Sequence, residues 1–478
     1  MLVQNWVSSR HSSSYDNRSA VCLLWNIKVL PASKLLSHTS QKAVIMESNL
    51  KSSVLLRMVL VGVIALLLLI PQMMIESLIT ERQTRRDSVV KEVNEKWGKD
   101  QTFTGPLLVL PYQRILKNDQ GKICEVQDRI ILLPKVLNAE IRMNSEVRYR
   151  SIFETVLYSS TLAVQAEFSL DPIHQLAIST DMIRWNDASL VLGISDLKGI
   201  HDTAAVRWEG KSLTVTPGVT APEIAPSGLS TGVRLSPAQS KYQCELHLSL
   251  NGSSGFQMIP VGEQTSVKIA GNWGNPSFSG EFLPVERKVD HDSFQAVWKI
   301  LNLNRPFPQA FLAGQYKVEQ SAFGVKLLVP IDEYQKTMRT TKYAIMFIAL
   351  MFTAFFVSEI LSARAIHPVQ YLFIGFALLL FYVLLLSLSE HLSFFVSYIA
   401  ASISIISLVT LYTSSLLGKL NSVFLGGILV ALYGFLYVTV QEQDYALIFG
   451  SCGLFLALAA VMYLTRRIDW FMIGKKEE

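Results

Sequence analysis

The sequence has few of the features that mark a soluble, charged or disulfide-bonded protein. Only 17% of its 478 residues are charged, and no run of Lys or Arg occurs. The net charge of +5 is too small to indicate nucleic-acid binding. Four cysteines, at positions 22, 124, 244 and 452, are too few and too dispersed for a disulfide framework or a zinc site. We therefore expect no nucleic-acid partner, no metal and no cofactor.

Catalytic motifs are equally scarce. The sequence contains no H-E-x-x-H, no Walker loop and no dinucleotide fingerprint. A G-x-S-x-G pattern occurs at residues 228–232, within a stretch rich in Pro, Gly and Ser. In hydrolases that pattern follows a strand and opens a helix, and this context is absent from the sequence. We expect no catalytic residues and no enzyme activity, and a membrane-bound hydrolase is the weakest alternative.

Long apolar runs are what the sequence does have. Half of its residues are hydrophobic, and the mean hydropathy is +0.32. A membrane-spanning helix needs about 20 apolar residues, and the first such run covers residues 54–78. No small-residue cleavage site follows it, which favours an anchor over a signal peptide. Five more runs lie close together near the C-terminus, at about 343–361, 369–388, 394–417, 423–440 and 445–464. The pattern predicts a bundle of six transmembrane helices, one plus five, in a lipid bilayer.

The short loops predict how the chain is oriented, because Lys and Arg favour the cytoplasmic side. With the N-terminus inside, the inner loops hold Arg364 and Lys419, and the basic tail 465–478 is also inside. The outer short loops then hold acids and His391 but no Lys or Arg. We predict cytoplasmic termini and an outer domain over residues 79–342. The Ser-rich residues 1–45 are expected to be disordered and to reflect a misassigned start, rather than a transit peptide.

The outer domain is predicted to be rich in β-structure. Residues 79–97 carry acid-before-base pairs at i,i+4, such as Glu81 and Arg85, and predict a helical stalk that ends at Gly98. Alternating strands follow and favour sandwich-like or barrel-like packing. The clearest cover 106–116, 122–133, 147–157, 242–250, 266–273, 294–301 and 322–330. Residues 216–238 predict a long loop or a junction between two β subdomains. Whether Cys124 and Cys244 form a disulfide stays open.

Ionisable residues at membrane level are candidate functional residues, because burying them in lipid is costly. Glu359 lies near the end of the second predicted span, with Arg364 and His367 just beyond it. Glu390 and His391 close the third span. They could form a proton or ion relay or contact a substrate. Their places near span ends favour interfacial pairing, since a transporter is expected to carry charge nearer the midplane.

The order of one span, a large β-rich domain and five clustered spans resembles the CreD family of inner-membrane proteins of Gram-negative bacteria. The resemblance covers about residues 50–470. The matching motifs are ERQTRR (81–86), WGKDQTFTGPLLVLPY (97–112), NWGNPSFSGEFLP (272–284), TKYAIMFIALMFTAFF (341–356), HPVQY (367–371), LLLSLSEH (384–391) and RRIDW (466–470). The resemblance implies a cell envelope integrity protein whose expression is tied to the Cre two-component system and to envelope and β-lactam stress. It implies no catalytic residues.

The segment NPSFSGEFLP is predicted to be a turn shaped by Gly and Pro. It is a candidate partner-binding loop, although a structural corner of the β domain is favoured. The candidate residues, in this segment and just before it, are Asn272, Trp273, Pro276, Phe278 and Gly280.

The leading hypothesis is a non-catalytic inner-membrane protein that maintains or senses envelope integrity. It would act through a periplasmic protein or an envelope ligand that contacts the outer domain. The main alternative is a transporter or permease component, because five clustered spans are more than an anchor needs.

Overall fold

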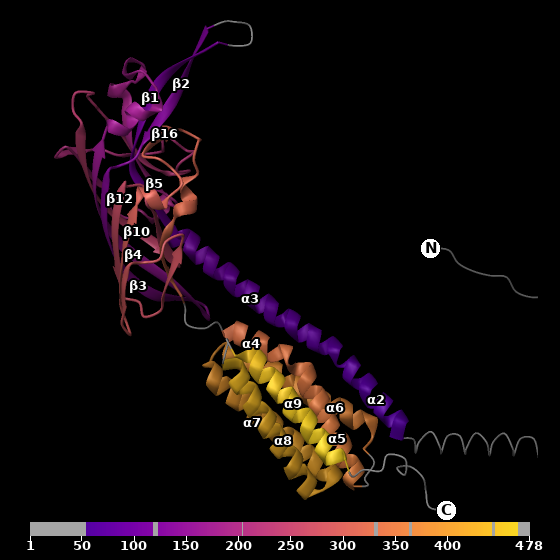
Figure 1. Cartoon of the computed structure of the whole chain (residues 1–478). Coiled ribbons are helices and arrows are strands. Elements are labelled where there is room, and N and C mark those ends of the chain that lie inside the picture. The colour runs from indigo at the N-terminus through magenta and orange to yellow at the C-terminus, as the bar shows by residue number, and fades with distance from the viewer. Residues whose placement is uncertain are drawn as a thin grey trace, which may run out of the picture. The chain divides into compact units, whose positions relative to one another are not determined.

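The computed structural model describes residues 54–117, 123–202, 204–328, 333–362, 366–441 and 445–466. The predicted disordered start, residues 1–45, and most of the predicted cytoplasmic tail lie outside the described residues. Residues 64–466 form one compact unit, in which an α-helix leads into a β domain that is followed by a helical bundle (Figure 1).

The first predicted span and the predicted stalk are one continuous helix. Helices α2 (Val54–Leu67) and α3 (Leu69–Trp97) are joined through Leu68, whose N–H donates to Ile64 O at 3.0 Å. The helix Leu56–Trp97 is 42 residues long. It ends at Gly98, where φ is +146° and a Cβ would lie 2.6 Å from Asn251 O. Only glycine fits this position without strain, which confirms the predicted stop.

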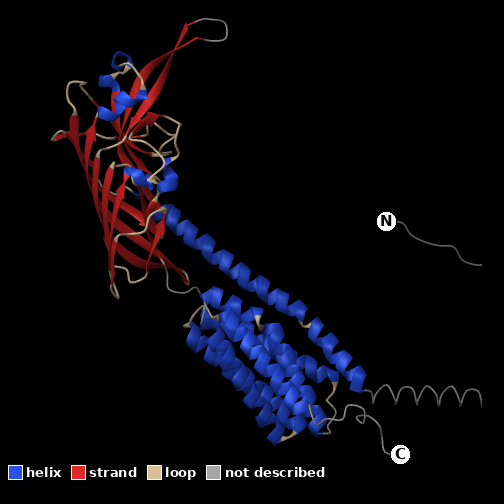
Figure 2. Cartoon of the chain, viewed as in Figure 1, coloured by secondary structure: helices blue, strands red, loops and turns tan. Residues whose placement is uncertain are grey.

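Two sheets make up the β domain (Figure 2). The first, sheet A, has the order β13-β17-β11-β1-β5-β9-β8, with β2 and β16 branching from β1. Its strands are β1 (Gln101–Lys117), β2 (Ile123–Leu132), β5 (Ala188–Ile194), β8 (Thr216–Pro217), β9 (Gly228–Val233), β11 (Gly255–Ile259), β13 (Pro276–Gly280), β16 (Ala310–Leu312) and β17 (Phe323–Leu327).

The second, sheet B, has the order β14-β15-β12-β3-β4-β10-β6-β7. Its strands are β3 (Val136–Arg150), β4 (Phe153–Ser169), β6 (Ala205–Trp208), β7 (Lys211–Leu213), β10 (Lys241–Ser253), β12 (Gln264–Gly271), β14 (Glu286–Val289) and β15 (Phe294–Leu301).

A single hydrophobic core joins the two sheets. Alternate residues of β3, β10 and β15 are buried, as expected for strands with one covered face. Trp298 on sheet B packs against Phe323 on sheet A, with ring centroids 5.4 Å apart. Both residues belong to one cluster of buried side chains drawn from both sheets. The outer region is therefore one β domain with a shared core and not two β subdomains.

Two predictions about strands are wrong. Residues 147–157 are two arms of the β3–β4 hairpin, which turns at Ser151 with φ +59°. The alternation of residues continues through the turn, which contains no Gly or Pro, so no local pattern indicates the turn. The predicted loop 216–238 contributes β8 and β9 to sheet A. The G-x-S-x-G pattern lies inside β9, where Ser230 pairs with Val191, and not at a strand-to-helix turn.

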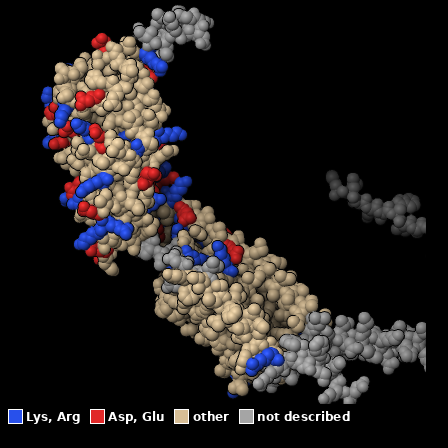
Figure 3. Space-filling model, in the orientation of Figure 1, with Lys and Arg blue, Asp and Glu red and all other residues tan. Residues whose placement is uncertain are grey.

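The C-terminal bundle contains α4 (Glu333–Lys342), α5 (Ala344–Ser362), α6 (Pro368–Ser389), α7 (Phe394–Leu417), α8 (Lys419–Gln441) and α9 (Ala446–Thr465). On the face drawn in Figure 3, charged side chains of the bundle lie mainly near its ends, whereas those of the β domain are scattered over its surface. Apolar side chains such as Leu411, Val423 and Phe455 are exposed on the surface of the bundle. This surface suits lipid rather than water.

The described residues hold four helices long and apolar enough to cross a membrane, α2 and α3 counting as one. The pair α4 and α5, bent by 43°, makes a fifth if it is one span. In α9 the described apolar helix, Ile448–Tyr463, is shorter than the other candidates. By length and composition, the structure thus supports four or five of the six predicted spans, and the others stay predictions.

Candidate functional site

Glu359 lies near the C-terminal end of α5 and is only 5% exposed. Its Oε1 accepts a hydrogen bond from Ile366 N at 3.1 Å, and its Oε2 accepts one from the Tyr371 hydroxyl at 2.8 Å. Tyr371 is buried on α6 and packs edge-on against Phe352, with centroids 5.5 Å apart. The carboxyl group therefore joins the end of α5 to the start of α6.

His367 caps the start of α6. Its Nδ1 accepts from Val369 N at 3.3 Å, and Gln370 Oε1 accepts from His367 N at 2.9 Å. This reciprocal arrangement is a capping box, and Pro368 occupies the first helical position. His367 thus has a structural role at the helix start. Arg364 lies outside the described residues, so its pairing with Glu359 stays a prediction.

Glu390 follows the other end of α6 and connects three helices. Its Oε1 accepts from the Tyr334 hydroxyl of α4 at 3.2 Å and lies 3.9 Å from Arg82 Nε of α3. The Arg86 guanidinium lies over the Tyr334 ring, 5.8 Å from its centroid. His391 is exposed, and its backbone N–H donates to Leu388 O. The structure therefore brings Glu390 together with α3 and α4, which the sequence did not indicate.

The same helix α3 is also fixed to the bundle nearer its N-terminus. Gln72, Ile75 and Ile79 are buried on one face, and Gln72 Nε2 donates to Thr341 O at 3.5 Å. A glutamine in an apolar span is costly unless it is hydrogen-bonded. Together with Arg82, these residues define the bundle anchor of α3.

The far end of α3 is fixed to sheet B. Asn94 Oδ1 accepts from the Thr155 hydroxyl at 3.0 Å, and Trp97 Nε1 donates to Tyr158 O at 3.3 Å. Arg148 lies 4.2 Å over the Trp97 ring, and Arg150 pairs with Glu92 at 3.0 Å. We call these contacts the domain anchor of α3. The sequence predicted the helix but neither anchor.

The predicted partner loop is a crossover between the two sheets. Asn272 Oδ1 accepts from Ser145 N at 2.5 Å, and Trp273 Nε1 donates to Leu328 O at 3.1 Å. Phe278 packs edge-on against Trp298, with centroids 5.9 Å apart. Pro276 and Gly280 bound β13, the edge strand that pairs with β17. This geometry favours the structural corner, and the partner-binding role stays a prediction.

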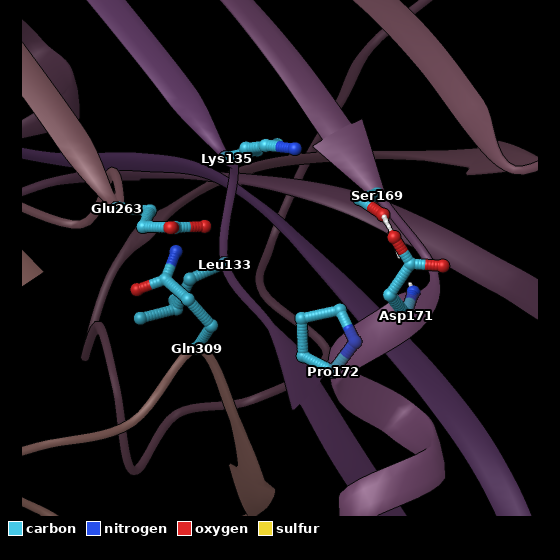
Figure 4. Close-up of a pocket in the computed structure, with 7 residues that line it drawn as sticks. All are labelled: Leu133, Lys135, Ser169, Asp171, Pro172, Glu263 and Gln309. Atoms are coloured by element: carbon cyan, nitrogen blue, oxygen red, sulfur yellow. Dashed lines mark hydrogen bonds between the residues drawn. The ribbon is translucent and has the colours of Figure 1, made fainter.

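A small pocket in the β domain is lined by Leu133, Lys135, Ser169, Asp171, Pro172, Glu263 and Gln309 (Figure 4). Its volume is about 60 Å³, which leaves room for only a few water molecules. Beside it, Arg305 is buried; its Nη2 donates to Val261 O at 3.2 Å and to Gln309 Oε1. Burial lowers the pKa of the Arg305 guanidinium to about 10, while Glu263 opposes that change. Arg305 stabilises loops through carbonyl groups, and the pocket is too small for a substrate.

The cysteines do not form a recognisable site in the described part of the chain. Cys244 is a buried free thiol on β10, and burial raises its pKa to about 12. The Cys124 side chain is not among those described. Within the described residues, no group of three His, Cys, Asp or Glu side chains is arranged to hold a metal ion.

The class of protein follows from these features: a multi-pass membrane protein with a two-sheet β domain inserted between its first helix and its C-terminal helices. Residues 53–471 match the family model described as "CreD: Inner membrane protein CreD". The chain is also 33% identical over 431 residues to "Inner membrane protein CreD" of Escherichia coli (strain K12), covering 88% of this chain and 95% of that protein. The chain belongs to the CreD family of inner-membrane proteins, and the resemblance seen in the sequence is confirmed.

Proposed function

We propose that this protein is a non-catalytic cell envelope integrity protein in which α3 links the β domain mechanically to the membrane bundle. One observation carries the proposal: a single helix is anchored at both ends by specific contacts. The bundle anchor includes Gln72 and Arg82, and the domain anchor includes Asn94 and Trp97. A continuous helix transmits displacement or rotation between such anchors, whereas a flexible linker does not.

The proposed orientation places both termini in the cytoplasm and residues 79–342 in the periplasm. It includes six spans, with α4 and α5 as one bent span and α9 as the last. Support comes from the cationic inner loops of this orientation, which contain Lys419, and from the acidic outer loops, which contain Glu390. A reporter that is active only in the cytoplasm is expected to be active when it is fused after Arg466, and a reporter that is active only in the periplasm is expected to be inactive there. Activity of a periplasmic reporter at this site would contradict the orientation.

The test of the linkage is a break in α3 between its anchors. Arg85 is exposed and belongs to neither anchor. Arg85→Pro removes a helical hydrogen bond and kinks the helix at a cost of about 3 kcal/mol, whereas the matched control Arg85→Ala keeps it helical. A deletion strain under detergent and β-lactam stress is expected to be rescued by Arg85→Ala but not by Arg85→Pro. Both variants must reach the membrane at wild-type levels.

Full rescue by Arg85→Pro would show that rigid coupling through α3 is not needed. Turnover of an envelope substrate by the purified protein would overturn the non-catalytic assignment.

Transport is the second candidate, and one feature of the bundle favours it. Tyr382, Tyr398 and Tyr433 bury their hydroxyls between α6, α7 and α8, and Tyr398 donates to Tyr433 O at 2.6 Å. Buried hydroxyls at membrane depth are costly and can line a polar path. Vesicles with the protein would then accumulate or release a solute that vesicles with Tyr398→Phe do not. Equal fluxes with and without the protein would remove this candidate.

A further inference from the structure

The outer face of sheet B carries a hollow that no part of the proposed mechanism uses. Its volume is about 390 Å³, within the usual range of small-ligand sites. Strands β3, β4, β10 and β6 and the residues before β6 line it. The lining residues are Glu140, Arg142, Thr161, Leu162, Ala163, Asp202, Ala205, His247, Leu248 and Ser249.

The strand register explains the shape of the hollow. One row across the sheet pairs Glu140 with Ala163, Ala163 with His247, and His247 with Ala205. The neighbouring row pairs Arg142 with Thr161, and Thr161 with Ser249. The short side chains of Thr161, Ala163, Ala205 and Ser249 form the floor. The longer side chains of Glu140 and Arg142 lie along the β3 edge of the floor, and His247 lies between Ala163 and Ala205.

These side chains point away from the core, because their sequence neighbours point into it. Ile141, Leu162 and Leu248 are all buried in the core shared by the two sheets. Successive side chains of a strand point to opposite faces. The hollow is therefore open on the outer face of the sheet.

The hollow lies beside the domain anchor of α3. That anchor occupies the same outer face, since Arg148 stacks on Trp97 and Thr155 binds Asn94. Gly98 packs against the backbone of Asn251, and Ser249, two residues earlier on β10, lines the hollow. A ligand in the hollow would thus lie next to the end of the helix that leads to the membrane.

Charges of opposite sign lie on opposite sides of the floor. On β3, Arg142 Nη2 lies 3.1 Å from Glu140 Oε1, and Lys268 of β12 lies 3.9 Å from the same oxygen. This side holds two cations for one acid. On the other side, His247 lies on β10, two strands from β3. Asp202 comes just before β6, three strands from β3, a distance of about 14 Å at about 4.8 Å per strand.

We infer that the hollow binds a short, hydrophilic peptide in an extended form. Its carboxylate would face Arg142, its ammonium group would face Asp202, and its amides would meet the hydroxyls of Thr161 and Ser249. At about 3.5 Å per residue, three or four residues span the floor. None of the ten lining residues is Phe, Tyr or Trp, the side chains on which a sugar ring usually stacks. The inference deepens the proposed function and rests on it for the periplasmic origin of the peptide.

Calorimetry on the purified full-length protein tests the inference, with trialanine as the probe. Wild type is expected to bind it with a Kd of about 1 mM or below. Arg142→Gln removes a charge-assisted hydrogen bond and should weaken binding about tenfold. Ala163→Leu fills the floor and should abolish binding. The control Arg287→Gln, on the exposed edge strand β14, should bind as wild type does.

N-acetyl-trialanine amide lacks both charges and should bind at least about tenfold more weakly than trialanine. Equal binding of the two peptides, or unchanged binding by both Arg142→Gln and Ala163→Leu, would overturn the inference. So would the absence of saturable heat with wild type. Arg85 lies outside the hollow. The peptide-binding test and the Arg85→Pro test can therefore fail independently of each other.

Discussion

Glu359 and Glu390 flank the two ends of α6, and they differ in where their partners lie along the chain. Glu359 binds groups 7 and 12 residues away, within the α5–α6 connection. Glu390 binds Tyr334, 56 residues away, and Arg82, on the first helix. The first carboxyl group therefore stabilises a local turn. The second joins segments that lie on either side of the β domain in the sequence.

At neutral pH, the largest effect is expected for Glu359→Ala. It leaves the Ile366 N–H and the Tyr371 hydroxyl without this acceptor in a buried site, at a cost of about 2 kcal/mol. Denaturant titration of the purified protein in detergent measures the free energy of unfolding. Tyr371→Phe, which removes one of the two hydrogen bonds, should cost about 1 kcal/mol. A variant as stable as wild type would show that the turn does not need the carboxyl group.

An intermediate effect is expected at the domain anchor. Asn94→Ala removes the acceptor of the Thr155 hydroxyl, and we expect a loss of about 1 kcal/mol. Hydrogen exchange of the last turns of α3 should increase in this variant. Lys91→Ala, at an exposed position of the same helix, is the control and should change stability by less than about 0.5 kcal/mol. Equal exchange in both variants would mean that Asn94 does not fix the helix end.

The smallest effect on stability is expected for the pair of Arg82 and Glu390. The Arg82 side chain is 43% exposed, so the coupling energy in a double-mutant cycle should stay below about 1 kcal/mol. Arg82→Gln, Glu390→Gln and the double variant complete the cycle. High salt should reduce the coupling further. A coupling as large as the loss in Glu359→Ala would remove the contrast between the two carboxyl groups.

The stability of the β-domain core at alkaline pH is expected to depend on Cys244. The raised pKa of Cys244, about 12 against an ordinary 9.0, favours the neutral thiol in the folded state. The resulting stability is complete below pH 9 and is lost as pH rises toward 12, by at most about 1.4 kcal/mol per pH unit. Cys244→Ala should lack this part of the alkaline decline. Parallel curves for wild type and variant would show that the thiol is not protected by burial.

Several local elements could be predicted because their signals are local. The stalk 79–97, its stop at Gly98 and the strands β1, β10, β12, β15 and β17 follow from periodicity, charge spacing and glycine. The turn at Ser151 and strand β9 could not be predicted, because neither has a distinctive composition. The cap that His367 forms at the start of α6 was not predicted either, and His367 stays a candidate functional residue.

By itself, the sequence determined the membrane character, the order of first helix, β-rich domain and bundle, and the family motifs. The length of an apolar run and the alternation of a strand are properties of neighbouring residues, so they can be recognised without knowing the fold. Only the tertiary structure decided that two sheets share one core, that α3 is anchored at both ends, and that Arg142, His247 and Asp202 surround one hollow. These features depend on sheet register and on contacts between distant segments, which local patterns do not encode.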